Sequence, residues 1–498
     1  MQADFVDFSE SIGEVNSAVG LAVQSFDDLN PDKLSPLLPQ IVSRQATLNI
    51  GAIGHVAHGK TTVVQAISNV RTMRHSSEAE GNKTIHLGYA NAKVFKCPRC
   101  PEPDCYSAYG SRQPDATTCP WCGVPAALIR HLSFIDCPGH DSLMATMLNG
   151  ASVMDAAMLL VAANEEFPRP QTREHLTAVE IMRLKAVIVV QNKIDLVQER
   201  EAQAQCAAIK QYLKKTSASA IGNSPVIPIN AQMRLNIDYV LEYLCHVPIP
   251  QRRFDMPLQM ICVRSFDINK PGEGIEDLKG GVAGGSVQQG VVRLGQEIEV
   301  RPGLCVRERG GMVCRPLRAR VRSLSSEQIP LLYAIPGGLI GVGTDLDPSL
   351  TRQNKLVGNV IGAPGTLGAP AIALDVEVTL LRHVVGHCVA GGSAASGRTL
   401  NRTASVPVLP CARSSTSPLS PPTTTAKIRQ GELLQITLFS VSLAADVVKV
   451  VGGLARLLLR SPAYCERGWR VALCRRIDLR WRLIGWGAIR CFTPVRIG

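Results

Sequence analysis

One eight-residue segment limits the possible folds of this chain more than any other part of its sequence. Gly54-His55-Val56-Ala57-His58-Gly59-Lys60-Thr61 fits the pattern G-x-x-x-x-G-K-[ST] in full. It follows an apolar run over residues 47–53 and opens a helical pattern over residues 60–69. The pattern requires this strand–loop–helix context. The segment therefore predicts a phosphate-binding loop and not a chance glycine-rich turn.

The residue types in this segment suit the binding of a nucleoside triphosphate. Backbone N–H groups of a glycine-rich loop can point inward around a β-phosphate, and the N-terminus of the following helix favours the anion. The Lys60 ammonium would reach the β- and γ-phosphates, and the Thr61 hydroxyl would bind Mg²⁺. The predicted nucleotide contacts of the loop are Gly54, Ala57, His58, Gly59, Lys60, Thr61 and Thr62.

A second motif indicates which base is bound. Asn192-Lys193-Ile194-Asp195 follows an apolar run over residues 186–190, at a place where open α/β sheets bind ligands. A carboxylate accepts from both N1–H and the exocyclic amine of guanine, and adenine offers no such pair of donors. Asn192 can connect neighbouring loops. The predicted base-side residues are Asn192, Lys193 and Asp195, together with Asn230, Ala231 and Gln232 after the last strand.

A third motif, Asp136-Cys137-Pro138-Gly139-His140, follows the strand-like run 131–135. Asp136 can hold Mg²⁺ through water, and the Gly139 N–H can contact a γ-phosphate. We expect His140 to be the catalytic residue that orients the attacking water; the alternative is a loop histidine with a purely structural role. Thr84 is the candidate for a second Mg²⁺ hydroxyl, in a loop that orders on the γ-phosphate.

Two C-x₂-C pairs lie 18 residues apart, a spacing that suits a closed tetrahedral zinc site. The predicted ligands are Cys97, Cys100, Cys119 and Cys122. Cys105 lies between the pairs and is either spare or a replacement for one of the four. The alternative is that all of them are free surface thiols. The acidic N-terminus does not resemble a secretory signal, so we expect the other cysteines to be reduced.

The organisation of the chain changes near residue 250. Residues 1–46 hold seven acids and two bases and are expected to form an acidic arm. Apolar runs alternate with helical patterns over residues 47–250, which predicts an α/β domain on a parallel sheet, with the zinc knuckle inserted at 97–122. Short runs punctuated by Gly and Pro then predict two β-barrels, at 256–367 and 368–498.

A low-complexity segment interrupts the second predicted barrel. Residues 386–425 contain three Arg but no Asp, Glu or Lys, and they are rich in Ser, Thr, Pro and Gly. Such a composition lacks the apolar side chains that offset the entropy of ordering. Two interpretations stay open: a flexible surface loop, or the translation of a misassigned intron.

The charge distribution points to a polyanionic partner. The net charge is +12, and residues 379–498 alone carry 17 Lys and Arg against 4 Asp and Glu. RNA is the expected neighbour, and a solubilising surface is the alternative. We expect no membrane span, because the most apolar stretch, residues 433–459, is interrupted by Asp446, Lys449 and Arg456.

Taken together, the three nucleotide motifs are typical of translational GTPases. Ala57 stands where most such proteins carry Asp. Four further sequence segments point to one family: residues 84–93, 143–150, 277–285 and 481–487. Over about residues 44–382 and 427–490 the chain closely resembles the gamma subunit of eukaryotic translation initiation factor 2. This resemblance implies a GTP-binding domain followed by two β-barrels, similar to elongation factor Tu, with GTP, Mg²⁺ and structural Zn²⁺.

The resemblance also implies partners and a cycle. Such a subunit is the core of a heterotrimer with alpha and beta subunits and, when bound to GTP, carries initiator methionyl-tRNA to the small ribosomal subunit in the cytosol. An activating protein stimulates hydrolysis after start-codon selection, and an exchange factor restores GTP. The aminoacyl end lies between the GTP-binding domain and the first barrel, which makes Asn82 and Tyr89 the tRNA-side candidates. Tyr89 could instead be a packed strand aromatic.

Some residues depart from the family pattern and leave alternatives. Position 230 is Asn where Ser is usual, and Lys83 and His86 are unusual side chains around Thr84. The alternative functions are an elongation-factor-like GTPase for a specialised aminoacyl-tRNA, such as selenocysteinyl-tRNA, and a GTP-binding scaffold without productive hydrolysis.

Overall fold

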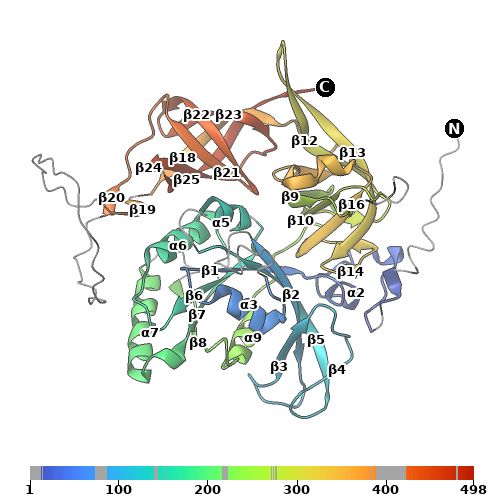
Figure 1. The fold of residues 1–498 in the computed structure, drawn as a ribbon, viewed down its shortest axis with the longest axis vertical. Coiled ribbons are helices and arrows are strands. Elements are labelled where there is room, and N and C mark those ends of the chain that lie inside the picture. Colours follow the sequence, from blue (N-terminus) through green and yellow to red (C-terminus); the bar gives the residue numbers. More distant parts are fainter. Residues whose placement is uncertain are drawn as a thin grey trace, which may run out of the picture.

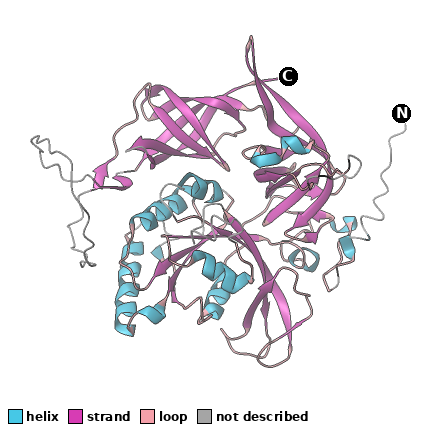
Figure 2. Ribbon diagram, in the orientation of Figure 1, coloured by secondary structure: helices cyan, strands magenta, loops and turns pink. Residues whose placement is uncertain are grey.

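The computed structural model consists of an α/β domain and two bodies made of strands (Figure 1). Figure 2 shows that the longer helices belong to the α/β domain. The residues that the structure describes are 13, 15–18, 20–72, 87–139, 144–151, 153–184, 186–215, 222–270, 272, 274, 278–381, 383–388, 422–477 and 480–498.

The α/β domain is built on one sheet with the strand order β3-β2-β5-β1-β6-β7-β8, and β4 pairs with β5. Pairing is parallel from β5 through β8, whereas β2 runs antiparallel to both β5 and β3. Every residue of β1 and β6 is buried, as expected for apolar strands covered on both faces. The strands are β1 (Leu48–Gly54), β2 (Gly88–Lys96), β3 (Tyr106–Gly110), β4 (Thr117–Thr118), β5 (Pro125–Asp136), β6 (Ala156–Ala162), β7 (Ala186–Asn192) and β8 (Val226–Pro228).

Helices cover both faces of this sheet. On one face α3 and α9 bury apolar residues such as Val64 and Leu244 against the strands. On the other face α5, α6 and α7 contribute Met147, Val179 and Leu213. The elements are α3 (Lys60–Ser68), α5 (Met144–Ala151), α6 (Pro170–Met182), the short helix η3 (Ile194–Leu196), α7 (Glu199–Lys214) and α9 (Ile237–His246).

The first strand body is a closed ring. Its strands follow the order β12-β17-β9-β10-β16-β13, and pairing between β12 and β13 closes the circle. Two short helices, η5 (Pro348–Leu350) and η6 (Arg352–Asn354), precede its last strand. The strands are β9 (Gln259–Phe266), β10 (Val282–Gln289), β11 (Val292–Arg293), β12 (Glu297–Glu308), β13 (Gly311–Ser326), β14 (Ile329–Pro330), β15 (Tyr333–Ala334), β16 (Leu339–Thr344) and β17 (Val360–Gly362).

The second strand body is a closed barrel with the order β18-β23-β22-β21-β24-β25. The final strand, β26, extends from the second barrel and pairs in parallel with β13 of the first barrel. The end of the chain therefore connects the two barrels through backbone hydrogen bonds. An α/β domain followed by two barrels was the expected fold, and it is confirmed. The strands are β18 (Ala371–Leu380), β21 (Leu433–Leu438), β22 (Val441–Val451), β23 (Leu454–Ala463), β24 (Arg470–Ile477), β25 (Arg480–Pro494) and β26 (Arg496–Ile497).

The low-complexity segment predicted at 386–425 lies for the most part outside the described residues. Its two described ends pair antiparallel as β19 (His383–Cys388) and β20 (Pro422–Thr424), with His383 opposite Thr424. Within the described part of the chain, no helix is both long and apolar enough to cross a membrane.

The described part of the N-terminal segment is more than an acidic arm. After the short helix η1 (Phe26–Asp28), the helix α2 (Pro39–Val42) buries Ile41 against Leu332, Tyr333 and Ile335 of the first barrel. The Arg44 side chain is fully buried and donates to the carbonyl oxygens of Ala22, Val15 and Pro330. This segment therefore joins the α/β domain to the first barrel.

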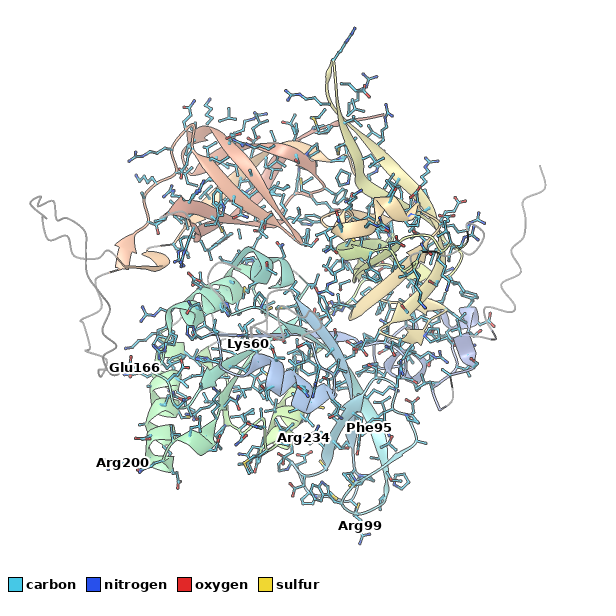
Figure 3. The ribbon with its side chains drawn as sticks, in the orientation of Figure 1. Lys60, Phe95, Arg99, Glu166, Arg200 and Arg234 are labelled. Atoms are coloured by element: carbon cyan, nitrogen blue, oxygen red, sulfur yellow. A yellow bond between two sulfur atoms is a disulfide. The ribbon has the colours of Figure 1, made fainter. Side chains whose placement is uncertain are left out.

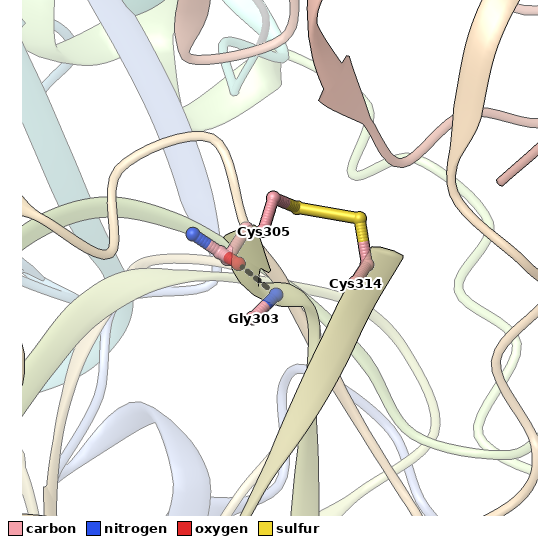
Figure 4. The surroundings of a disulfide bond; sticks show 4 residues. Gly303, Cys305 and Cys314 are labelled. Atoms are coloured by element: carbon pink, nitrogen blue, oxygen red, sulfur yellow. Dashed lines mark hydrogen bonds between the residues drawn. A yellow bond between two sulfur atoms is a disulfide. The ribbon is translucent and has the colours of Figure 1, made fainter. Parts of the chain in front are cut away.

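One pair of cysteines departs from the expectation that the thiols are reduced. Cys305 of β12 and Cys314 of β13 face each other across the ladder and form a disulfide (Figure 4). Their Cα atoms are 4.1 Å apart, as directly opposed strand residues allow. Next to it, the Gly303 N–H donates to Asn359 Oδ1 at 2.9 Å. The expectation is wrong for this pair. It was based on the reducing conditions of the cytosol and did not consider that the two cysteines lie opposite each other on paired strands.

Candidate functional site

The loop between β1 and α3 has the backbone that its sequence predicts. Gly54 and Gly59 have φ values of +140° and +88°, a region that only glycine enters freely. A Cβ on Gly54 would lie 2.4 Å from the Leu160 carbonyl oxygen, and one on Gly59 would lie 2.3 Å from Asn192 Nδ2. Glycine is therefore required at both positions, because the loop is packed tightly against β6 and the end of β7.

Lys60 lies inside this loop, near the middle of the molecule (Figure 3). Its side chain is 6% exposed, and Nζ donates to the carbonyl oxygens of Gly54 at 3.0 Å and His55 at 2.8 Å. Burial lowers the pKa of Lys60 to about 8, although the Asp136 carboxylate opposes the change. A buried ammonium that donates to two carbonyl oxygens is well suited to an incoming anion such as a phosphate.

Oxygen atoms of three side chains meet beside the lysine. Thr61 Oγ1 donates to Asp136 Oδ2 at 2.6 Å, and Thr72 Oγ1 donates to the same oxygen at 2.7 Å. Asp136 ends β5 and is fully buried. Hydroxyl and carboxylate oxygens are the ligands that Mg²⁺ prefers. The residues present therefore fit the ion that the sequence predicts, with Thr61 and Asp136 as the residues that would hold it.

Gly139 passes directly over the loop. A Cβ at this position would lie 2.5 Å from Lys60 Nζ and 2.9 Å from the Gly54 carbonyl oxygen. The predicted γ-phosphate contact is thus next to the predicted phosphate-binding lysine. Two other predicted residues of this region, His140 and Thr84, lie outside the described residues.

On the base side, the side chain of Asn192 joins two loops. Its Nδ2 donates to the His58 carbonyl oxygen at 3.0 Å, and its Oδ1 accepts from the Ala231 N–H at 3.1 Å. Asn230 Oδ1 in turn accepts from the N–H groups of Gln232 and Met233. Three sequence segments, namely the loop containing His58, the motif that begins at Asn192 and residues 230–232, therefore meet in one place.

The remaining predicted contacts differ in exposure. Asp195 lies on η3 with its side chain exposed, so its carboxylate is accessible to a base. Lys193 precedes it with a φ of +64°. Thr62 is exposed on α3, and Ala57 has a φ of +62°, an uncommon conformation for a residue with a Cβ.

Sequence reasoning missed two side chains that hold this loop. His175 of α6 accepts a hydrogen bond at Nδ1 from the Gly54 N–H, 2.8 Å away. Glu165 lies 3.2 Å from His58 Nε2, while His58 Nδ1 faces the Leu160 carbonyl oxygen at 2.9 Å. His175 lies 121 residues from Gly54 in the sequence, and no local pattern distinguishes it from a surface residue.

The four cysteines predicted as zinc ligands come together. Their sulfur atoms all lie within 4.8 Å of one another, with Cys97 and Cys122 at 3.4 Å and Cys100 and Cys119 at 3.7 Å. This donor set fits a closed tetrahedral zinc site. Cys105 is buried outside the group, and its carbonyl oxygen accepts from the Cys97 N–H at 2.9 Å.

A cavity of about 780 Å³ opens between the α/β domain and the first barrel. Tyr89 of β2 lies in its wall, and the guanidinium of Arg264 lies 4.9 Å from the centre of the Tyr89 ring. Burial raises the pKa of the Tyr89 phenol to about 12. The lining also includes Asn91, Phe266 and Ser325. Asn82, the other predicted tRNA-side residue, lies outside the described residues.

Comparison with known proteins agrees with this geometry. The sequence profile "Elongation factor Tu GTP binding domain" matches residues 45–249, and "Initiation factor eIF2 gamma, C terminal" matches residues 414–489. "Eukaryotic translation initiation factor 2 subunit gamma" of Schizosaccharomyces pombe is 47% identical over 467 residues, which cover 93% of this chain and 98% of that protein. The chain belongs to the eukaryotic translation initiation factor 2 gamma family.

A second relative extends the match. "Eukaryotic translation initiation factor 2 subunit 3" of Drosophila melanogaster is 46% identical over 484 residues, 95% of this chain and 96% of that protein. The chain is thus a translational GTPase of the initiation class, an enzyme that hydrolyses GTP. The C-terminal profile begins at residue 414, inside the predicted insertion at 386–425. The family match therefore starts 13 residues before residue 427, where the sequence resemblance was expected to resume.

Solved structures share the fold at lower identity. The bacterial selenocysteine-specific elongation factor EF-Sec is 18% identical with a TM-score of 0.62; the match covers 89% of this chain but only 58% of EF-Sec. Elongation factor SelB of Methanococcus maripaludis, in complex with the GTP analogue GppNHp, is 18% identical with a TM-score of 0.61, covering 91% of this chain and 80% of SelB. At this identity the likeness establishes the three-part architecture alone.

Proposed function

We propose that this chain binds GTP and initiator methionyl-tRNA, delivers the tRNA to the small ribosomal subunit and hydrolyses GTP on start-codon selection. The observation that carries the proposal is the cavity beside Tyr89, which opens between the GTP-binding domain and the first barrel. A chain of this family needs a place for the aminoacyl end of a tRNA. This cavity has an aromatic wall, an arginine and a volume in the range of small-ligand sites.

In this proposal the described loop residues bind the nucleotide. Lys60, Gly139 and the backbone around Gly54 and Gly59 contact the phosphates, and Asp195 reads guanine. Mg²⁺, when bound beside Thr61 and Asp136, neutralises charge on the transferring phosphate. Asn192 positions the two loops that meet at the base, because its amide joins the His58 and Ala231 backbones.

We further propose that His140 orients the attacking water and that Thr84 supplies the second hydroxyl for Mg²⁺. The support for His140 is its motif, since Asp136 and Gly139 of the same motif lie beside Lys60. The support for Thr84 is its place in the sequence after the phosphate-binding loop. A scaffold without turnover is the competing function. Single-turnover GTP hydrolysis on ribosomal complexes separates the two: His140→Ala should abolish the stimulated rate, and an unchanged rate would remove His140 from catalysis.

The cysteine cluster is proposed to hold one structural Zn²⁺. Four sulfurs leave no open coordination position, so the metal would fix the loop ends and take no part in hydrolysis. The partners proposed are the alpha and beta subunits of the same factor, an activating protein and an exchange factor, in the cytosol. The names "subunit gamma" and "subunit 3" of the two relatives support an assembly of several subunits.

Filter binding of the full chain to labelled tRNA tests the proposed function. With a non-hydrolysable GTP analogue, initiator methionyl-tRNA should bind at least tenfold more tightly than elongator methionyl-tRNA, and replacing the analogue by GDP should weaken binding. Tyr89→Ala should reduce tRNA affinity, whereas Tyr89→Phe, which keeps the ring that Arg264 contacts, should retain most of it. Equal binding of the two tRNAs would favour an elongation-factor-like function and contradict the proposal.

A further inference from the structure

The phosphate-binding loop is held from outside the nucleotide motifs by a residue of α6. His175 is 2% exposed, and its Nδ1 lies 2.8 Å from the Gly54 backbone nitrogen. Only an unprotonated Nδ1 can accept this hydrogen bond. Burial lowers the pKa of His175 to about 3, and the positive charge of Lys60 and the nearby His55 and His58 lower it further. The imidazole is therefore neutral at physiological pH.

Gly54 is fixed on both of its sides. Its N–H donates to His175, while its carbonyl oxygen accepts from Lys60 Nζ at 3.0 Å. Gly54 has a φ of +140°, and a Cβ added to it would lie 2.4 Å from the Leu160 carbonyl oxygen. The backbone at this position therefore has little freedom to move. The orientation of this one glycine is therefore linked to the position of Lys60, the lysine proposed to contact the phosphates.

The helix that carries His175 is itself anchored. The preceding residue, Glu174, forms a buried ion pair with Arg482 of the second barrel at 3.1 Å. Arg470 of the same barrel donates to the Ile181 carbonyl oxygen near the end of α6. Because neighbouring residues of α6 contact the loop and the barrel, the helix gives His175 a defined position.

We propose that His175 is a positioning residue for nucleotide binding: its neutral imidazole accepts from the Gly54 N–H and so sets the phosphate-binding loop in the conformation that places Lys60. This inference rests on the proposed role of residues 54–61 in binding GTP. It assigns no contact between His175 and the nucleotide. Loss of the acceptor leaves a buried N–H without a partner, which favours other loop conformations.

Two matched substitutions test the proposal. Asn and Leu share a branched skeleton at Cγ, and Asn keeps an acceptor one bond beyond Cγ, where Nδ1 stands in histidine. The dissociation constants of fluorescently labelled GDP and of a labelled non-hydrolysable GTP analogue are measured on the full chain. His175→Leu should weaken both by roughly tenfold to a hundredfold, and His175→Asn should stay within about threefold of the parent.

A thermal melt without nucleotide accompanies each variant as a control for folding. A purely structural role would lower the melting temperature of both variants and leave their nucleotide affinities equal. Equal affinities of His175→Leu and His175→Asn, whether both match the parent or both fall, overturn the proposal. Lys60→Ala serves as the separate test of the loop: if that variant binds nucleotide like the parent, it is the proposed role of residues 54–61 that fails.

Discussion

Glu174 of α6 and Arg482 of β25 form an ion pair at 3.1 Å between the GTP-binding domain and the second barrel. Both side chains are largely withdrawn from solvent, with 4% of Glu174 and 11% of Arg482 exposed. Around them, Cys474 and Leu483 of the barrel pack into the same apolar cluster as Leu176 of α6. The contact between these two domains thus combines apolar packing with a buried pair of charges.

Removing Arg482 should destabilise the chain much more than removing an exposed arginine. Arg482→Met leaves the Glu174 carboxylate buried without this partner, which costs about 3 kcal/mol. Arg490→Met is the matched control, because Arg490 pairs with Glu377 on the surface. The Arg490 side chain is more than half exposed, and the Glu377 side chain is half exposed. Denaturant unfolding measures both variants. Adding Glu174→Gln to Arg482→Met should recover part of the loss, and equal effects of the two arginine substitutions would contradict this expectation.

Local chemistry made it predictable from the sequence that the proposed nucleotide-binding segments lie close together. The motif around Gly54 fixes its own backbone through glycine, and Asp136 and Asn192 each follow an apolar strand. Since parallel strands end at one edge of the sheet, these three segments had to meet there. The structure brings Thr61 to Asp136 and Asn192 to the loop, as such a sheet requires.

Contacts over long sequence separations were not predictable in this way. His175 and its partner Gly54 are 121 residues apart, and the periodicity of an amphipathic helix does not identify a buried histidine. The charge pattern of the N-terminal segment suggested an acidic arm, yet Arg44 is buried, and backbone carbonyl oxygens accept from its Nε and Nη1 atoms. The Cys305–Cys314 bridge depends on strand register, which cysteine spacing does not reveal.

Asp195 should determine which base is bound. An Asn side chain cannot accept from both donors of guanine, so Asp195→Asn should weaken GTP binding by roughly tenfold to a hundredfold. Xanthine carries a carbonyl oxygen where guanine has its amine, and the new amide can donate to it. XTP affinity should therefore rise in the variant. Competition binding with both nucleotides measures the change, with the exposed Asp104→Asn as control; a variant that still prefers GTP would exclude Asp195 as the base-reading residue.

Metal analysis should distinguish the four clustered cysteines from the fifth one between them. The purified chain is expected to contain about one zinc per molecule. Cys97→Ser should lose the metal and lower the melting temperature, because metal binding and folding are coupled. Cys105→Ser should keep the metal, since its sulfur lies outside the cluster. A chain without zinc, or loss of zinc in Cys105→Ser but not in Cys97→Ser, would overturn the ligand assignment.

Nucleotide binding should take up protons near pH 8. Burial lowers the pKa of Lys60 to about 8 in the free site, and an adjacent phosphate raises it again because opposite charges favour the ammonium. Near pH 8 about half of the free chains carry a neutral Lys60, so binding draws a proton from solution. Near pH 6.5 the lysine is charged before and after binding, so binding no longer takes up a proton at Lys60. Affinity should accordingly fall as the pH rises through 8.

Calorimetry of Mg²⁺–GDP binding at pH 8.5 and pH 6.5, in two buffers of different ionisation enthalpy, measures this uptake. Binding of the same nucleotide to Lys60→Arg is the control, because a guanidinium stays protonated throughout this range. Proton uptake should appear only for the parent and only at the higher pH. Uptake of the same size in Lys60→Arg would assign the proton to another group, and no uptake in the parent would mean that Lys60 keeps its charge in the empty site.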